Sequence, residues 1–112
     1  MSHGQEVIRD TDRALLGYVR EADGDLWSPL TVFGYPLGPD APYDEARDTV
    51  EQRGLATLAD RWHLRDTDGE WYACAIQEAT PARVRVSITD LGHPDVYSSR
   101  TIENPTPETL RM

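Results

Sequence analysis

The strongest constraint on this chain is an alternation of apolar and polar residues between Asp60 and Asp90. A side-chain period of two is typical of strands that turn one face to a core and the other to water. The apolar members of the pattern all carry even numbers: Trp62, Leu64, Tyr72, Cys74, Ile76, Val84, Val86 and Ile88. The pattern predicts an antiparallel three-stranded meander with its even-numbered side chains on the inner face.

The first turn of this meander is predicted by Asp66-Thr67-Asp68-Gly69. A three-residue loop with Gly69 in the left-handed region would pair Leu64 with Tyr72 and keep even positions opposite even positions. The same residues resemble a calcium-binding loop only superficially, because aligning Gly69 with the invariant glycine of that loop places Leu64 and Ala75 at its two most important ligand positions. We therefore interpret the segment as a hairpin turn.

The second turn is predicted at Ala79-Thr80-Pro81-Ala82, because a proline has no N–H with which to continue a strand ladder. This turn would pair Ile76 with Val84 and Cys74 with Val86. A slip of one residue would expose the whole apolar set, so the register should be well specified.

Residues 13–33 allow two interpretations. Strand-forming residues precede the turn signal Asp23-Gly24, and a second strand from Leu26 to Phe33 would complete a hairpin, although Pro29 restricts that strand to an edge or to two pieces. The alternative is a helix over residues 10–22, which Gly17 disfavours. Residues 1 to about 10 hold few apolar side chains and are expected to fray.

The segment from Trp27 to Pro39 is apolar but contains three prolines and two glycines, which exclude a helix. Its large side chains either close the open end of a sheet or form a rigid binding loop.

One helix is predicted from Pro42 to about Arg61, since proline and carboxylates occupy its first turn and apolar residues recur every three to five positions. Gly54 in its middle predicts a bend or a close approach to the sheet. The simplest arrangement lays the apolar stripe of the helix over the even-numbered face of the meander. With a fourth strand at 96–102 and an extended tail from about residue 104, the prediction is a single α+β domain of 112 residues: an antiparallel sheet packed against one main helix.

The charge of the chain limits its partners. It has 20 acidic and 11 basic residues, all of the latter arginines, and a net charge of −9. This charge argues against nucleic acid and against an anionic membrane surface, because both attract cations. A GC-rich coding sequence or adaptation to high salt would explain the composition without any function, whereas an acidic surface that meets a basic partner is the functional alternative.

Neither a secreted nor a catalytic protein is predicted. The chain has a single cysteine, Cys74, no run of about 18 apolar residues and no signal-peptide pattern at its start, so we expect a cytoplasmic protein without a membrane anchor. The sequence contains none of the common phosphate-binding, nucleophile or zinc motifs, and its three histidines have no ligand at metal-binding spacing. We therefore expect no catalytic residues, metal or cofactor.

Three sets of residues are candidates for function. The leading hypothesis is a non-catalytic protein-interaction module that contacts a protein partner or a second copy of itself through the outer face of the meander or through the Trp27–Leu37 loop, since tryptophan and arginine are enriched at interface hot spots. The alternatives are a small-molecule or catalytic pocket between helix and sheet, and an acidic inhibitor that covers a basic partner. The outer-face set is His63, Arg65, Trp71, Arg83 and Arg85; the pocket set is Trp27, Tyr35, Trp62 and Tyr72; the acidic set is Asp40, Asp44, Glu45, Asp48 and Glu51.

Overall fold

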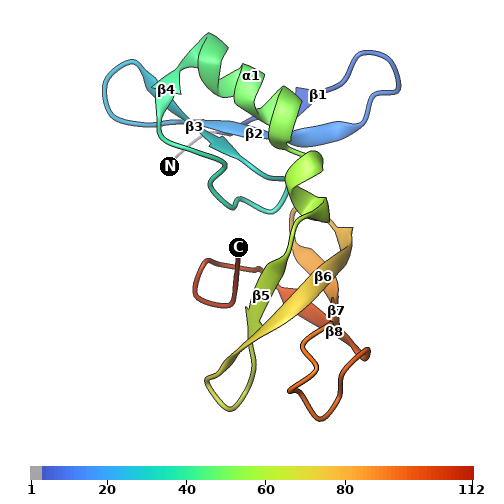
Figure 1. Ribbon diagram of the computed structural model, residues 1–112. Coiled ribbons are helices and arrows are strands. Elements are labelled where there is room, and N and C mark those ends of the chain that lie inside the picture. The colour runs from blue at the N-terminus through green and yellow to red at the C-terminus, as the bar shows by residue number, and fades with distance from the viewer. Residues whose placement is uncertain (1–3) are drawn as a thin grey trace. The chain divides into compact units, whose positions relative to one another are not determined.

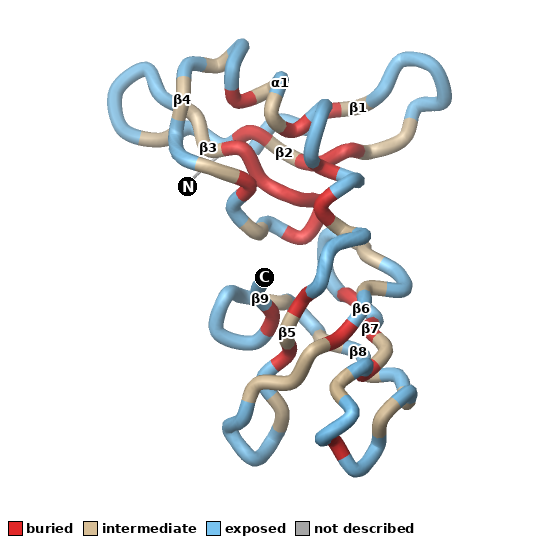
Figure 2. Tube along the Cα trace, in the orientation of Figure 1, coloured by how far each residue is buried: buried red, intermediate tan, exposed pale blue. Residues whose placement is uncertain are grey.

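The computed structural model describes residues 4–112, and it has the predicted α+β class, with antiparallel sheets and one main helix (Figure 1). The chain divides into two compact units, Met1–Leu58 and Ala59–Met112. Each unit has buried side chains of its own, as the burial along the chain in Figure 2 indicates. The prediction of a single domain stays a prediction, because two such units are compatible with one folding domain or with two.

The first unit contains a four-stranded antiparallel sheet with the strand order β1-β2-β3-β4. Its strands are β1 (Gly4–Ile8), β2 (Leu15–Glu21), β3 (Leu26–Leu30) and β4 (Ala41–Pro42). β2 and β3 form the predicted hairpin, and Gly24 in its turn has a φ of 65°. The competing helix over residues 10–22 is wrong. Fraying up to residue 10 is also wrong for Gly4–Ile8, because these residues pair with β2; residues 1–3 lie outside the described part of the chain.

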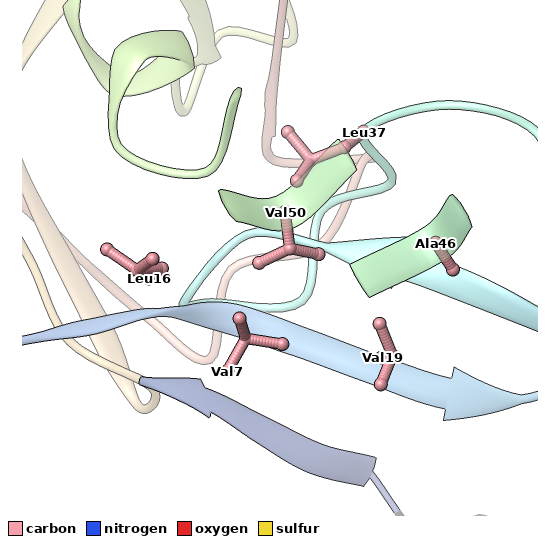
Figure 3. Close-up of a cluster of buried hydrophobic side chains, with 6 residues drawn as sticks. All are labelled: Val7, Leu16, Val19, Leu37, Ala46 and Val50. Atoms are coloured by element: carbon pink, nitrogen blue, oxygen red, sulfur yellow. The ribbon is translucent and has the colours of Figure 1, made fainter. Parts of the chain in front are cut away.

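The helix α1 (Tyr43–Arg53) follows Pro42 and carries Asp44 and Glu45 in its first turn, as predicted, but it ends at Gly54 rather than near Arg61. A short 3₁₀ turn, Ala56–Ala59, follows it. The expectation that α1 covers the meander is wrong, because its buried residues pack on the first sheet. Figure 3 shows this cluster, which consists of Val7, Leu16, Val19, Leu37, Ala46 and Val50.

Two glycines allow the helix and its C-terminal end to approach β2 closely. A Cβ atom on Gly17 of β2 would lie 2.3 Å from the carbonyl oxygen of Leu30 and 2.9 Å from Cγ1 of Val50. A Cβ atom on Gly54 would lie 2.2 Å from the carbonyl oxygen of Leu16. The close approach to the sheet, one of the two roles considered for Gly54, is observed.

The second unit is a five-stranded antiparallel sheet with the order β8-β7-β6-β5-β9. Its strands are β5 (Trp62–Arg65), β6 (Trp71–Ala79), β7 (Arg83–Ile88), β8 (Ser99–Glu103) and β9 (Leu110–Arg111). The first three are the predicted meander, and β8 is the predicted fourth strand, shifted toward the C-terminus by turns at residues 91–97. The tail is not loosely held at its end, because β9 pairs with β5 and Leu110 is fully buried.

The even-numbered side chains of the second unit form its core, as the alternation predicted. Tyr72 and Ile76 are half-buried at the margins of the core. The buried members are Trp62, Leu64, Cys74, Val84, Val86, Ile88 and Leu110. Burial raises the pKa of the Cys74 thiol to about 12, so this cysteine is an inert part of the core.

The two predicted turns have different outcomes. Gly69 has a φ of 82°, Asp66 N–H donates to the carbonyl of Glu70, and Leu64 pairs with Tyr72, as predicted. At the second turn the predicted pairing is wrong by two residues, since Ile76 pairs with Val86 rather than with Val84.

A bulge explains the second register. The short turn pairs Ala79 with Val84, which by itself would set odd positions opposite even ones along the two strands. The ladder shifts by one residue between Ile76 and Glu78, and this shift restores even opposite even beyond Gln77. The bulge is the feature that allows a short turn and a continuous core to coexist.

Candidate functional site

The outer face of the second sheet carries the residues predicted to bind a partner, and these residues fall into two groups. Arg65 and Trp71 lie directly opposite each other on β5 and β6, next to the pair of His63 with Ala73. Arg83 and Arg85 lie on β7 near the other end of β6, where Arg85 pairs with Glu78. The structure therefore places all five residues on one face but does not gather them at one point.

The β7 group borders a hollow of about 360 Å³. Two of its lining residues are arginines, and the only carboxylate among them belongs to Glu78, whose Oε2 lies 3.4 Å from Nη2 of Arg85. The side chain of Arg83 makes no ion pair or hydrogen bond with residues 4–112, although Glu103 lies opposite it in the ladder. The hollow is lined by Glu78, Thr80, Ala82, Arg83, Arg85 and Thr101.

The hollow has an excess of positive charge in an acidic protein. An exposed arginine–glutamate pair at 3.4 Å contributes little to stability, so Glu78 is readily exchanged for another carboxylate. The planar guanidinium presents several N–H donors in a fork that fits a carboxylate. The hollow is therefore suited to an anionic group from outside the chain.

At the other end of this face, Trp71 is half-buried because Arg111 lies over its ring, with the guanidinium carbon 3.9 Å from the ring centroid. Sequence reasoning missed Arg111, because the two-residue strand β9 is too short to produce a visible alternation. Arg111 pairs with His63 across β9 and β5, so it adds a second arginine to the group of Arg65 and Trp71.

A second feature that the sequence did not predict is a buried histidine–aspartate pair. His93 is only 6% exposed, and its Nε2 lies 2.6 Å from Oδ2 of Asp66. Its Nδ1 accepts a hydrogen bond from the backbone N–H of Asp95, so the proton of the neutral ring lies on Nε2 and is donated to Asp66. The ring meets Tyr72 edge to face, with the centroids 4.5 Å apart.

This pair, which we call the His93 clasp, links the β5–β6 turn to the loop between β7 and β8, the two segments that extend from one end of the second unit in Figure 1. The hydrogen bond from His93, followed by that from the amide of Thr67, lowers the pKa of Asp66. Beside the clasp, the hydroxyl of Tyr72 donates a hydrogen bond of 2.6 Å to Oδ2 of Asp68. This hydrogen bond lowers the pKa of Asp68 and raises the pKa of Tyr72 to about 12.

The His93 clasp is a contact between two segments of the chain. Both ring nitrogens of His93 are engaged within the chain, so neither is available to a substrate. Sequence analysis singled out His63 instead of His93. His93 lies in a loop and has no side-chain hydrogen-bonding partner nearby in the sequence, so no pattern indicated its role. Only the fold brings Asp66 to it.

The four residues of the predicted pocket are divided between the two units. Trp27 packs edge to face on Tyr43, with the ring centroids 5.1 Å apart, and Tyr35 lies half-buried in the loop after β3. Trp62 is fully buried in the core of the second unit, and Tyr72 contacts the His93 clasp. None of the four lines the hollow beside Arg83 or a smaller one of about 210 Å³ in the first unit.

The acidic set lies on and just before α1, and all five side chains are exposed. Three of them are already engaged: Glu51 with Arg47 at 3.0 Å, Asp48 with the amide of Gln52 at 2.9 Å, and Asp40 with the hydroxyl of Ser28. These local contacts give the set the character of a solvated helix surface.

The loop after β3 is mostly turned inward. Of the side chains that made this loop a candidate for binding, Phe33 and Leu37 are at most 7% exposed, whereas Trp27 and Tyr35 are half-buried. This arrangement corresponds to the interpretation in which they close a sheet.

Neither a cluster of metal ligands nor a membrane-spanning helix is found in residues 4–112. No group of three or more His, Cys, Asp or Glu side chains in this range could hold a metal ion. In the same range, no helix has the length and apolar character needed to cross a membrane.

Comparison with known proteins adds no relative from which a role could be inferred. Models of protein families give no match to the chain, and neither do curated proteins or solved structures.

Proposed function

We propose that this protein is a small non-catalytic interaction module that binds an acidic segment of a partner protein at the hollow lined by Arg83 and Arg85. The observation that carries the proposal is that one concave surface holds two exposed guanidiniums, those of Arg83 and Arg85, but only one carboxylate, that of Glu78, which is weakly held by Arg85. Carboxylates of a partner would form charge-assisted, bidentate hydrogen bonds with these groups.

The arrangement of charge in the chain favours an acidic protein segment over other anions. A net charge of −9 repels a long polyanion such as nucleic acid, whereas a short acidic segment needs to approach only the local cations of the sheet. The group of Arg65, Trp71 and Arg111 on the same face offers a second contact for a longer segment.

The proposal includes a cytoplasmic location. Cys74, the only cysteine, lies in the core and is a free thiol, which is compatible with a reducing compartment.

The test is a titration of the protein into a fluorescein-labelled peptide of alternating glutamate and serine, followed by fluorescence anisotropy. Changing Arg83 and Arg85 together to glutamate is expected to weaken binding at least ~10-fold, because each charge-assisted hydrogen bond contributes about 1.5–3 kcal/mol and the new carboxylates repel the peptide. The double alanine variant should show a smaller loss, and raising the salt concentration should weaken binding of the unaltered protein.

The double variant Arg13→Glu/Arg20→Glu is the matched control, because both arginines are exposed in the first unit and the change in net charge equals that of the Arg83/Arg85 variant. It should bind the peptide nearly as well as the unaltered protein. Equal losses in the control and in the Arg83/Arg85 variant would reject the hollow as the site, and tighter binding of a labelled oligothymidine than of the peptide would reject a protein partner.

A further inference from the structure

The strand β8 is an open edge of the second sheet. Two hydrogen bonds at its ends show which of its residues bond to β7 and which direct their backbone groups away from it. Ile88 N–H donates to the carbonyl of Ser98 at one end, and Asn104 N–H donates to the carbonyl of Ala82 at the other. In an antiparallel ladder, hydrogen-bonded and non-hydrogen-bonded pairs alternate. The pair of Arg85 with Thr101 is therefore of the second kind, as are the pairs that involve Ser99 and Glu103.

It follows that Ser99, Thr101 and Glu103 direct their backbone N–H and C=O groups away from β7. All three residues are exposed, and no further strand pairs with β8 in the part of the chain that the structure describes. The carbonyl of Ser99 is reached at 3.4 Å by Nη1 of Arg100. The open stretch is therefore centred on Thr101.

Thr101 also lines the hollow, so the open backbone and the two arginines belong to one surface. We infer that the acidic partner segment binds as an added strand along β8, with a glutamate or aspartate opposite Thr101 whose carboxylate reaches Arg85 and Arg83. This inference rests on the proposed function and specifies how the segment is held. Backbone hydrogen bonds to β8 align the segment, and the two arginines bind its acidic side chain.

The inner face of β8 indicates which residues of the bound segment should be apolar. Ile102 alternates with Thr101 and is half-buried, so it leaves part of an apolar side chain at the edge. Side chains of an added strand alternate between the two faces. The expected ligand is thus an extended segment in which an acidic residue on the outer face is flanked by apolar residues that pack beside Ile102.

The experiment compares three labelled peptides by anisotropy. One is an unmodified peptide of alternating glutamate and valine, and the other two carry N-methyl groups on every second amide, one in each of the two possible phases. Methylation of the donors that face β8 is expected to weaken binding at least 10-fold, and methylation of the opposite phase should leave it nearly unchanged. The charge of the peptide is the same in all three.

On the protein side, Thr101→Pro removes an outward donor without removing a bond to β7, and proline is tolerated at an edge strand in this orientation. It should weaken binding of the glutamate–valine peptide at least 10-fold. Thr101→Val changes the same side chain but keeps the N–H, so it should weaken binding much less than Thr101→Pro; equal losses in the two variants would contradict strand addition. Retained folding of both variants is checked from the amide spectrum of β7.

The two proposals can fail separately. Loss of binding in the Arg83/Arg85 variant together with no effect of Thr101→Pro or of peptide methylation would overturn strand addition and leave acidic recognition standing. No loss in the Arg83/Arg85 variant would overturn both. Loss in all three cases is the result that we expect.

Discussion

Gly17→Ala is expected to destabilise the first unit by at least about 3 kcal/mol, which is near the upper end of the usual range for a single substitution. The new methyl group would meet the carbonyl oxygen of Leu30 at 2.3 Å and Val50 at 2.9 Å. Gly17 also has a φ of 153°, a conformation that an alanine adopts only with strain. The helix α1 would have to move away from β2, and the cluster around Val50 would open.

Hydrogen exchange measured by mass spectrometry is the suitable readout, because it follows each unit separately. Amides of β2 and α1 should exchange much faster in the variant, while those of β7 serve as a reference within the same molecule. Gly38→Ala is the control, since nothing lies within 4 Å of its Cβ position and its φ is not positive. Equal protection of β2 in Gly17→Ala and Gly38→Ala would contradict the packing described for the helix.

His93→Ala is expected to lower the free energy of unfolding of the second unit by about 2–4 kcal/mol, the second large effect. The substitution leaves the carboxylate of Asp66 and the N–H of Asp95 without their partner and removes the edge contact with Tyr72. Urea unfolding of the variant, followed through amides of β5 to β8, measures the loss. A loss below about 0.5 kcal/mol, as at an ordinary surface position, would show that the clasp does not hold the turn and loop together.

The same clasp predicts an acid sensitivity with a definite sign. Asp66 and Asp68 have folded-state pKa values below the ordinary 3.8, so their contribution to stability is complete above that pH and is lost as the pH falls through the lower, folded-state values. Asp66→Asn keeps an acceptor for His93 but cannot titrate. Its stability should therefore fall less steeply below about pH 4 than that of the unaltered protein.

The alternation of apolar residues predicted the second unit well because its core is built from one face of a meander. Parity alone placed Trp62, Cys74 and Ile88 inside, and the loop containing Gly69 was predicted from its turn chemistry. Parity could not reveal the bulge at Gln77, because a bulge has no signature when the residues on either side keep the alternation.

Other features escaped prediction because they depend on contacts distant in sequence. The apolar stripe of α1 fits any apolar face, and nothing local indicates that Gly17 makes β2 the surface that the helix can approach most closely. The stacking of Arg111 on Trp71 and the pairing of His93 with Asp66 likewise join residues more than 20 positions apart. Arg83 and Arg85 were predicted to share one face with Trp71. The sequence did not show that they lie near the opposite end of β6 from Trp71.

The most direct test of the central claim, that the hollow receives acidic partner segments, is a titration of the ¹⁵N-labelled protein with the glutamate–serine peptide, monitored by amide chemical shifts. The account predicts that the largest shifts occur at Arg83, Arg85 and Thr101, which line the hollow. Largest shifts at residues 44–51 of α1, or none at β7 and β8 at a concentration where the anisotropy has saturated, would contradict it.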